Sequence, residues 1–134
     1  MNEGKMKVGV TQKAIVLRND GKFLTIRRSK TAPSHKLKWD LPGGELEYGE
    51  GPVEGIVREI KEETGCAVDR PKPFDVFGHE NAVGFWVTIA YLCHTSSDVV
   101  ELSFEHDDFK WVSKEEFLAL SSTDKLQQFV SNLE

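Results

Sequence analysis

The chain has 134 residues, of which 39% are hydrophobic and 29% charged, and it carries a formal net charge of −5 at pH 7. This composition is that of an ordinary globular protein and excludes a disordered chain. The acidic balance argues against stable nucleic-acid binding, which depends on phosphate neutralisation by lysine and arginine. We therefore expect a single domain over residues 1–134 with one core.

The apolar residues are not gathered into segments that could enter a membrane. Lysines and polar residues interrupt the N-terminal stretch 1–17, which is unlike a signal peptide, and the longest apolar stretch, 85–93, is too short to span a bilayer. The two cysteines, Cys66 and Cys93, lack the paired spacing of zinc sites and redox dithiols. We expect a cytoplasmic protein with reduced, buried cysteines and no membrane partner.

The first predicted element is a β-hairpin. Residues 8–18 are rich in β-branched side chains, and Asn19-Asp20-Gly21 supplies a turn into a second strand at 22–27. A polar loop is expected at 31–38. A basic run extends along this part of the chain and consists of Arg27, Arg28, Lys30, His35, Lys36 and Lys38. Two interpretations of the run stay open, namely a solvated loop or a rim that faces phosphate groups.

Further strands and helices are predicted downstream. Residues 39–41 favour a short strand that Pro42-Gly43-Gly44 ends, and the two glycines would let the backbone approach a ligand closely. Odd positions between 83 and 93 are all apolar, which predicts a strand with one face on the core. Other expected elements are strands at 99–102 and 109–112, a helix that begins after Ser113 with a capping box to Glu116, and a helix at 124–133. Mixed strands with few helices favour an α/β sandwich.

A helix predicted between Pro52 and Gly65 carries the chemistry. Its apolar stripe, expected to face the core, consists of Val53, Ile56, Val57, Ile60 and Thr64. Its acidic residues Glu59, Glu62 and Glu63 lie within an arc of about 100° on another side, where like charges and the helix dipole both destabilise them. Either this is an exposed acidic face paired with Arg58, or it supplies oxygen ligands to a hard divalent cation beside the glycine turn.

A family resemblance decides between these interpretations. The residues Gly44, Glu50, Arg58, Glu59, Ile60, Glu62, Glu63, Gly65 and Cys66 match, in order and spacing, the signature G-x5-E-x7-R-E-U-x-E-E-x-G-U of the Nudix hydrolases, the family of MutT-like enzymes. If each of the seven exact positions matched by chance about one time in fifteen, a full match would have odds on the order of 10⁻⁷. The resemblance implies a Nudix-type α/β/α sandwich with a mixed β-sheet. It also implies hydrolysis of a nucleoside diphosphate linked to another group, X.

The resemblance further implies a metal site. Glu59, Glu62 and Glu63 would hold Mg²⁺, with Mn²⁺ as the alternative, and a backbone carbonyl of Gly43 or Gly44 would complete the ligand set. The cation would neutralise the phosphates and activate a water.

The supporting roles follow from the same resemblance. Arg58 would orient the carboxylates, and Glu50 would position the opening of the helix or a water. Because the general base varies within the family, Glu105 is our candidate for it, and a simple polar turn is the alternative at that position.

The group X is read by loops outside the signature. Branches that act on ADP-ribose or diadenosine polyphosphates often carry a proline or tyrosine beyond it, where this chain has Asn81-Ala82-Val83. A nucleoside triphosphate or a nucleotide sugar is therefore favoured, and an ADP-ribose type is retained. The expected substrate contacts are Gly43, Gly44, Arg27 and Trp86, with Phe77, Tyr48 and His79 as further aromatic candidates that could equally belong to the core or the rim.

Two alternatives to an enzyme stay open: a catalytically silent nucleotide-binding sensor and an acidic interaction module. Every signature glutamate is present, which favours turnover over a pure binder. Because related enzymes are often dimers, a homodimer is a further expectation.

Overall fold

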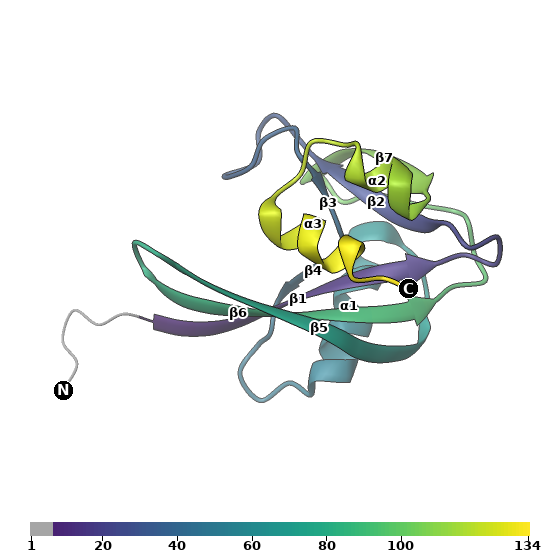
Figure 1. The fold of residues 1–134 in the computed structure, drawn as a ribbon. Helices are drawn as coiled ribbons and strands as arrows, with labels where there is room; N and C mark the ends of the chain where they lie inside the picture. The colour runs from purple at the N-terminus through teal and green to yellow at the C-terminus, as the bar shows by residue number, and fades with distance from the viewer. Residues whose placement is uncertain (1–6) are drawn as a thin grey trace.

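The computed structural model describes residues 7–134. In chain order these residues form β1 (Lys7–Leu17), β2 (Phe23–Arg28), β3 (Trp39–Asp40), β4 (Gly43–Glu45), α1 (Pro52–Thr64), β5 (Asp69–Asn81), β6 (Gly84–His94), β7 (His106–Val112), α2 (Lys114–Leu118) and α3 (Asp124–Ser131) (Figure 1). No helix within this part of the chain has the length and apolar character needed to cross a bilayer.

The strands form one mixed sheet in the order β3-β2-β1-β6-β5. Strands β1 and β6 run parallel over their whole length, from the pair Lys7 and Gly84 to the pair Leu17 and His94. All other pairings are antiparallel, including β4 on β1 and β7 on β2. The mixed β-sheet expected from the sequence is therefore confirmed.

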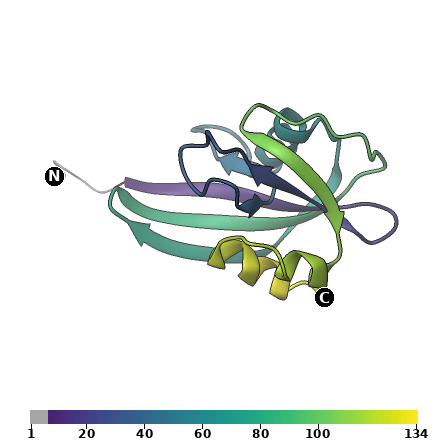
Figure 2. The same cartoon turned by 90° about the horizontal axis from the view of Figure 1, so that it is seen from above.

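Helices cover the sheet on both faces, with α1 on one side and α2 with α3 on the other (Figure 2). Successive residues of β1 divide between two cores because side chains of a strand alternate between its faces. Ala14 and Val16 pack with Ile56 and Ile60 of α1, whereas Ile15 packs with residues of α2 and α3. The fold is thus an α/β/α sandwich, as predicted.

Helix α1 begins and ends at the predicted residues. Pro52 occupies its first turn, and Gly65 closes it in the left-handed conformation with φ 77°. Ile56, Ile60 and Thr64 are buried as expected, but Val53 is 46% exposed and does not face the core. Gly55 is buried as well, and a Cβ at this position would lie against Glu50 and Gln12.

The strand predicted at 99–102 is wrong. This segment forms no ladder, because its backbone is used to complete the end of α1: the N–H groups of Glu101 and Ser103 donate to the carbonyls of Thr64 and Glu63 at 2.8 and 3.1 Å. The loop before β7 is therefore fixed to the end of α1 that carries the acidic residues.

Strand β5 was not predicted, because Pro71 and Pro73 interrupt its sequence pattern. It is the edge strand of the sheet, where missing N–H donors are tolerated, and its pairing with β6 is irregular near both prolines.

The expectation that the odd positions of 83–93 face the core holds only for the second half of that segment. Tyr91 and Cys93 are buried against α1, whereas Phe85 is 44% exposed and Thr88, an even position, is buried. The first half of β6, together with the second half of β5 and the start of β1, projects beyond the helices (Figure 1).

The face containing α2 and α3 has two predicted helices and one apolar hollow. The capping box between Ser113 and Glu116 is present, and α3 begins at Asp124 as expected.

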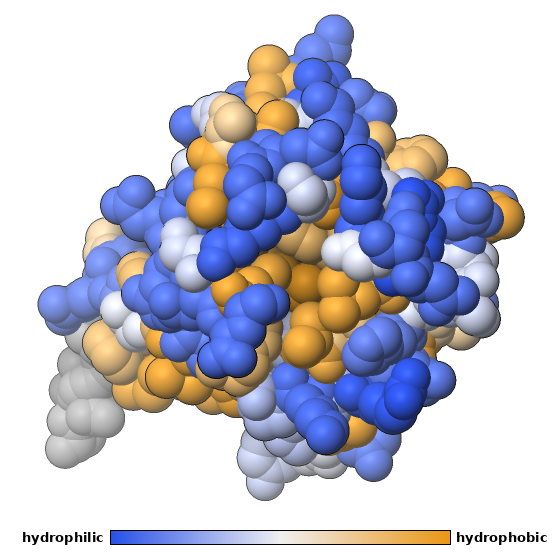
Figure 3. All heavy atoms as spheres, turned by 45° about the vertical axis from the view of Figure 1, so that its right-hand side comes forward, coloured by the Kyte–Doolittle hydropathy of each residue, from blue (hydrophilic) through white to orange (hydrophobic). Residues whose placement is uncertain are grey.

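An apolar cavity of about 390 Å³ is lined by Leu17, Phe23 and Leu133, among other residues. In Figure 3 apolar side chains lie at the bottom of a hollow with a polar rim.

Candidate active site

The glycine turn before α1 is held tightly against the central strand. Gly43 and Gly44 pair with Lys13 and Gln12 of β1. A Cβ at Gly43, whose φ is 154°, would overlap the carbonyl oxygen of Gln12, and a Cβ at Gly44 would overlap the Glu59 carboxylate. Only glycine allows this close approach, so the turn brings backbone groups directly to the acidic side of α1.

Glu63 is the most deeply buried of the three signature carboxylates. Its Oε1 accepts a hydrogen bond of 2.9 Å from the Gly43 N–H. Burial raises the pKa of Glu63 to about 7, against the opposing effects of the Lys13 charge and the Gly43 hydrogen bond. The Glu63 carboxylate is therefore incompletely solvated and is directed toward the glycine turn.

Arg58 lies among the remaining carboxylates. Its Nε is 2.6 Å from Glu50 Oε2, Nη2 is 3.0 Å from Glu59 Oε1, and Nη1 is 3.0 Å from Glu62 Oε1. The hydrogen bond with Glu50 is the largest cause that raises the pKa of Arg58, and it lowers the pKa of Glu50. One guanidinium thus fixes three acids in place.

The donor set suits a divalent cation of the hard type, since it consists of carboxylate and carbonyl oxygens. Burial also raises the pKa of Glu59, although Arg58 opposes the shift, whereas the Glu62 side chain is 60% exposed. Within residues 7–134 no three acidic, histidine or cysteine side chains are grouped closely enough to hold one ion. Glu62 instead accepts a hydrogen bond from Arg58 Nη1 at 3.0 Å. The residues fit the cation chemically, and Glu62 would have to leave Arg58 to join its neighbours.

A buried ion pair lies behind the glycine turn. Lys13 Nζ is 2.9 Å from Asp40 Oδ1 and also donates to the Leu41 carbonyl at 3.1 Å. Burial alone would raise the pKa of Asp40, but the Lys13 charge and the hydrogen bonds that the carboxylate accepts together outweigh burial and hold that pKa well below its usual range. His106 Nε2 is 3.9 Å from Asp40 Oδ2, which is too far for a hydrogen bond.

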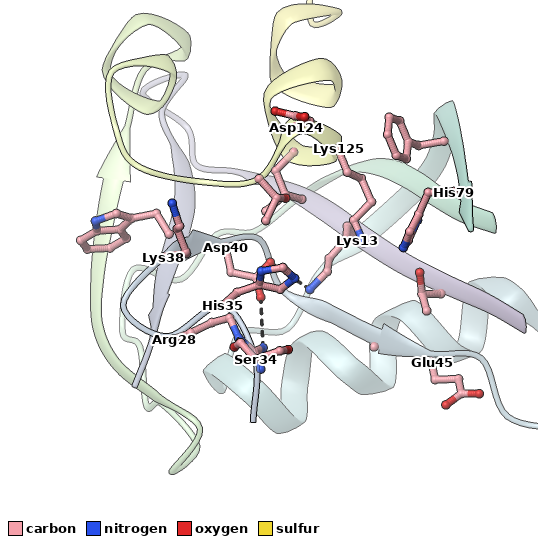
Figure 4. A pocket seen from close by; sticks show the side chains of 16 residues that line it. Lys13, Arg28, Ser34, His35, Lys38, Asp40, Glu45, His79, Asp124 and Lys125 are labelled. Atoms are coloured by element: carbon pink, nitrogen blue, oxygen red, sulfur yellow. Dashed lines mark hydrogen bonds and ion pairs between the residues drawn. The ribbon is translucent and has the colours of Figure 1, made fainter. Parts of the chain in front are cut away.

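A cavity of about 470 Å³ opens beside the glycine turn. Its lining comes from β1, the loop before β3, β4, β5 and the start of α3, and Figure 4 shows Lys13, His79 and Lys125 around its interior. Two of the aromatic candidates, Phe77 and His79, belong to this lining.

The structure does not bring every predicted site residue to this cavity. Trp86 lies outside the lining, with Lys7 Nζ 5.0 Å from its ring centroid, and Arg27 pairs with Asp107 at 2.9 Å. Tyr48 is fully exposed. Glu105 lies in the turn before β7, where its carbonyl accepts a hydrogen bond from Ser29 N–H at 2.9 Å.

Three charged residues of this region, Lys13, Asp40 and Lys125, were not predicted from the sequence. The sequence carries an indication for two of them, because Lys13 and Asp40 are charged residues within strand segments whose other residues are mostly apolar. Charged residues are rarely buried in such segments unless they are paired. Lys125 stands in an ordinary amphipathic helix and gave no such signal.

A model of the NUDIX domain matches residues 8–133, so the chain belongs to the Nudix hydrolase family. It is 34% identical over 107 residues to a MutT-like protein of Streptomyces ambofaciens, covering 80% of this chain and 65% of that protein. It is 36% identical over 63 residues to the 8-oxo-dGTP diphosphatase of Escherichia coli K12, covering 46% of each. The match thus spans less than two thirds of the length of these two relatives.

Solved structures agree with this assignment. The MutT protein from Methanosarcina mazei Go1 superimposes with a TM-score of 0.80 at 30% identity, over 94% of this chain and 92% of that one. The family expected from the signature is confirmed.

We predict that Asp40→Asn lowers the free energy of unfolding by about 3–5 kcal/mol, because it leaves the Lys13 ammonium buried without a countercharge. Urea unfolding at neutral pH measures the change. The exposed Asp108→Asn on β7 serves as the control and should change stability by less than about 0.5 kcal/mol. Equal effects of the two substitutions would contradict a structural role for the Lys13–Asp40 pair.

Proposed function

We propose that this chain hydrolyses a phosphoanhydride bond in a nucleoside diphosphate linked to X, with Mg²⁺ or Mn²⁺ as its cofactor. The observation that carries the proposal is the position of Glu59 and Glu63, two carboxylates whose pKa values are raised by burial and which face the Gly43–Gly44 turn. Buried carboxylates without full solvation are costly unless a cation compensates them. A purely structural acidic surface would leave these groups in water.

The proposed ligands are the carboxylates of Glu59, Glu62 and Glu63 and the carbonyl of Gly43. When bound there, Mg²⁺ or Mn²⁺ supplies neutralisation of phosphate charge and activation of a water. Arg58 would orient Glu59 through their contact of 3.0 Å, and Glu50 keeps Arg58 in place through the hydrogen bond of 2.6 Å, whereas Glu62 would turn from Arg58 toward the cation.

Glu105 stays our candidate for the general base. The loop that precedes it is tied to α1 by the hydrogen bond from Ser103 N–H to the Glu63 carbonyl, 3.1 Å long, so the chain two residues away from Glu105 lies beside the proposed ligands. A carboxylate at that place could accept a proton from the attacking water.

A nucleoside triphosphate is the substrate that we favour. One relative is an 8-oxo-dGTP diphosphatase, and the cavity of about 470 Å³ beside Gly44 has the size of a nucleoside site. Nucleotide sugars and ADP-ribose-type compounds remain within the proposed class. The glycine turn would contact the phosphates, whereas Arg27 and Trp86 stay predictions outside the cavity lining.

A cytoplasmic location, a homodimer and the absence of stable nucleic-acid binding stay predictions from the sequence. The net charge of −5 supports the last of these.

We expect the purified protein to release phosphate or pyrophosphate from members of a nucleotide panel when Mg²⁺ or Mn²⁺ is present, and EDTA to abolish the release. Chromatographic identification of the products shows which bond is cut. Turnover that survives EDTA would overturn the proposed cofactor. A silent sensor would instead bind nucleotides in calorimetry and release nothing under any metal condition.

Glu62→Gln should reduce kcat at least about a hundredfold, because it removes one negative charge from the ligand set with little change of shape. The matched control is Glu54→Gln, an exposed acid on the first turn of the same helix, which should keep kcat within about twofold. Circular dichroism checks that both variants fold. Near-normal turnover of the Glu62 variant would remove this residue from the ligand set.

A further inference from the structure

The cavity beside the glycine turn has two chemically different ends. One end is formed by Gly44 and Glu45 of β4, next to the carboxylate of Glu59. The other end is formed by Phe77 and His79 of β5 with the first residues of α3. If the proposed function is right, a substrate whose phosphates reach the carboxylates places its base in this second end.

Lys125 extends from the start of α3 into this second end, toward the part of β1 that carries Lys13 (Figure 4). Among residues 7–134 no hydrogen bond or ion pair of this ammonium is found, and the Asp40 carboxylate, which pairs with Lys13, acts on it only from beyond ion-pair distance. Burial and the nearby Lys13 charge lower the pKa of Lys125 to about 8. Lys125 is partly buried, so its ammonium is incompletely solvated, and a hydrogen-bond acceptor on a bound molecule would compensate it.

Two more polar atoms around the same end have no partner in the described part of the chain, namely Thr123 Oγ1 and His79 Nδ1, and both are inaccessible to solvent. Buried polar atoms without a hydrogen bond are uncommon and call for a missing partner. Apolar contact surface is supplied by Phe77 and Leu126. Apolar surface beside polar atoms that have no partner suits a flat heteroaromatic ring with a polar edge.

We propose that Lys125 is a specificity-determining residue that donates a hydrogen bond to an oxo group of the nucleobase. An ammonium has three donors and no acceptor, so it pairs with a carbonyl oxygen but not with an amino group at the same position. The enzyme therefore prefers 6-oxopurine and 4-oxopyrimidine nucleotides over their 6-amino and 4-amino counterparts. Specificity of this kind is strong, because the wrong base leaves a buried donor unpaired.

The test compares kcat/KM for ITP against ATP and for UTP against CTP, since the members of each pair differ at the oxo or amino position and the adjacent ring nitrogen. The wild-type enzyme should prefer the oxo member by about 10- to 100-fold, mainly through KM. In Lys125→Met this preference should fall to about twofold or less through a loss for the oxo nucleotides. In Lys125→Gln it should fall because the amide also accepts a hydrogen bond from an amino group.

The matched control is Lys22→Met, at a partly exposed lysine close to the hairpin turn and outside the cavity lining, which should keep the oxo preference of the wild type. Isothermal titration calorimetry with the same four nucleotides measures the oxo preference as a ratio of Kd values. The inference is then tested even if hydrolysis itself fails, and such a failure would count against the proposed function alone.

Two results would overturn the role of Lys125. One is a wild-type protein without an oxo preference in either Kd or kcat/KM. The other is an equal loss for all four nucleotides in Lys125→Met, which would place the ammonium on the sugar or the phosphates.

Discussion

The hydrogen bond from the Gly43 N–H to the Glu63 carboxylate joins the two parts on which the site depends, the glycine turn and the acidic end of α1. It requires that β4 lie close to β1, which the absence of side chains at Gly43 and Gly44 allows. It also requires that α1 cross the sheet with Ile56 and Ile60 in the core. Burial of hydrophobic side chains, roughly 1.5–3 kcal/mol each, thus holds carboxylates where water solvates them poorly.

The ion pair between Lys13 and Asp40 also supports this arrangement, next to the glycine turn. The Lys13–Asp40 pair joins β1 to the end of β3, immediately before the glycine turn, and the Lys13 charge also opposes the increase in the pKa of Glu63. One buried lysine therefore acts on both the backbone of the turn and the electrostatics of the proposed ligands. The same side chain borders the cavity in which we place the base, so the proposed phosphate and base sites would share one scaffold.

Most of the fold could be predicted from local sequence signals. The boundaries of α1 follow from Pro52 and Gly65, and the capping box of α2 follows from Ser113 and Glu116, because these residues act through adjacent backbone groups. Segments whose structure depends on distant partners were not predictable in this way. Residues 99–102 look like a strand, but they hydrogen-bond to the end of α1, and β5 contains prolines that only an edge strand tolerates.

The same distinction between local signals and distant partners applies to the residues of the site. The signature residues are contiguous enough to be read directly, and the structure shows what the sequence could not, namely that Arg58 holds Glu50, Glu59 and Glu62 together. The cavity combines residues from β1, β5 and α3 that are far apart in the chain. Neither Lys125 nor Asp40 could be assigned to it before their neighbours in space were known.

We propose that a divalent cation compensates the poorly solvated carboxylates beside the glycine turn. The most direct measurement is the melting temperature of the nucleotide-free protein, recorded by calorimetry with increasing millimolar MgCl₂ and compared with the variant Glu59→Gln/Glu63→Gln. We expect Mg²⁺ to raise the Tm of the wild type in a concentration-dependent way and to leave the Tm of the double variant almost unchanged. An unchanged Tm of the wild type, or an equal increase in both proteins, would contradict the proposal.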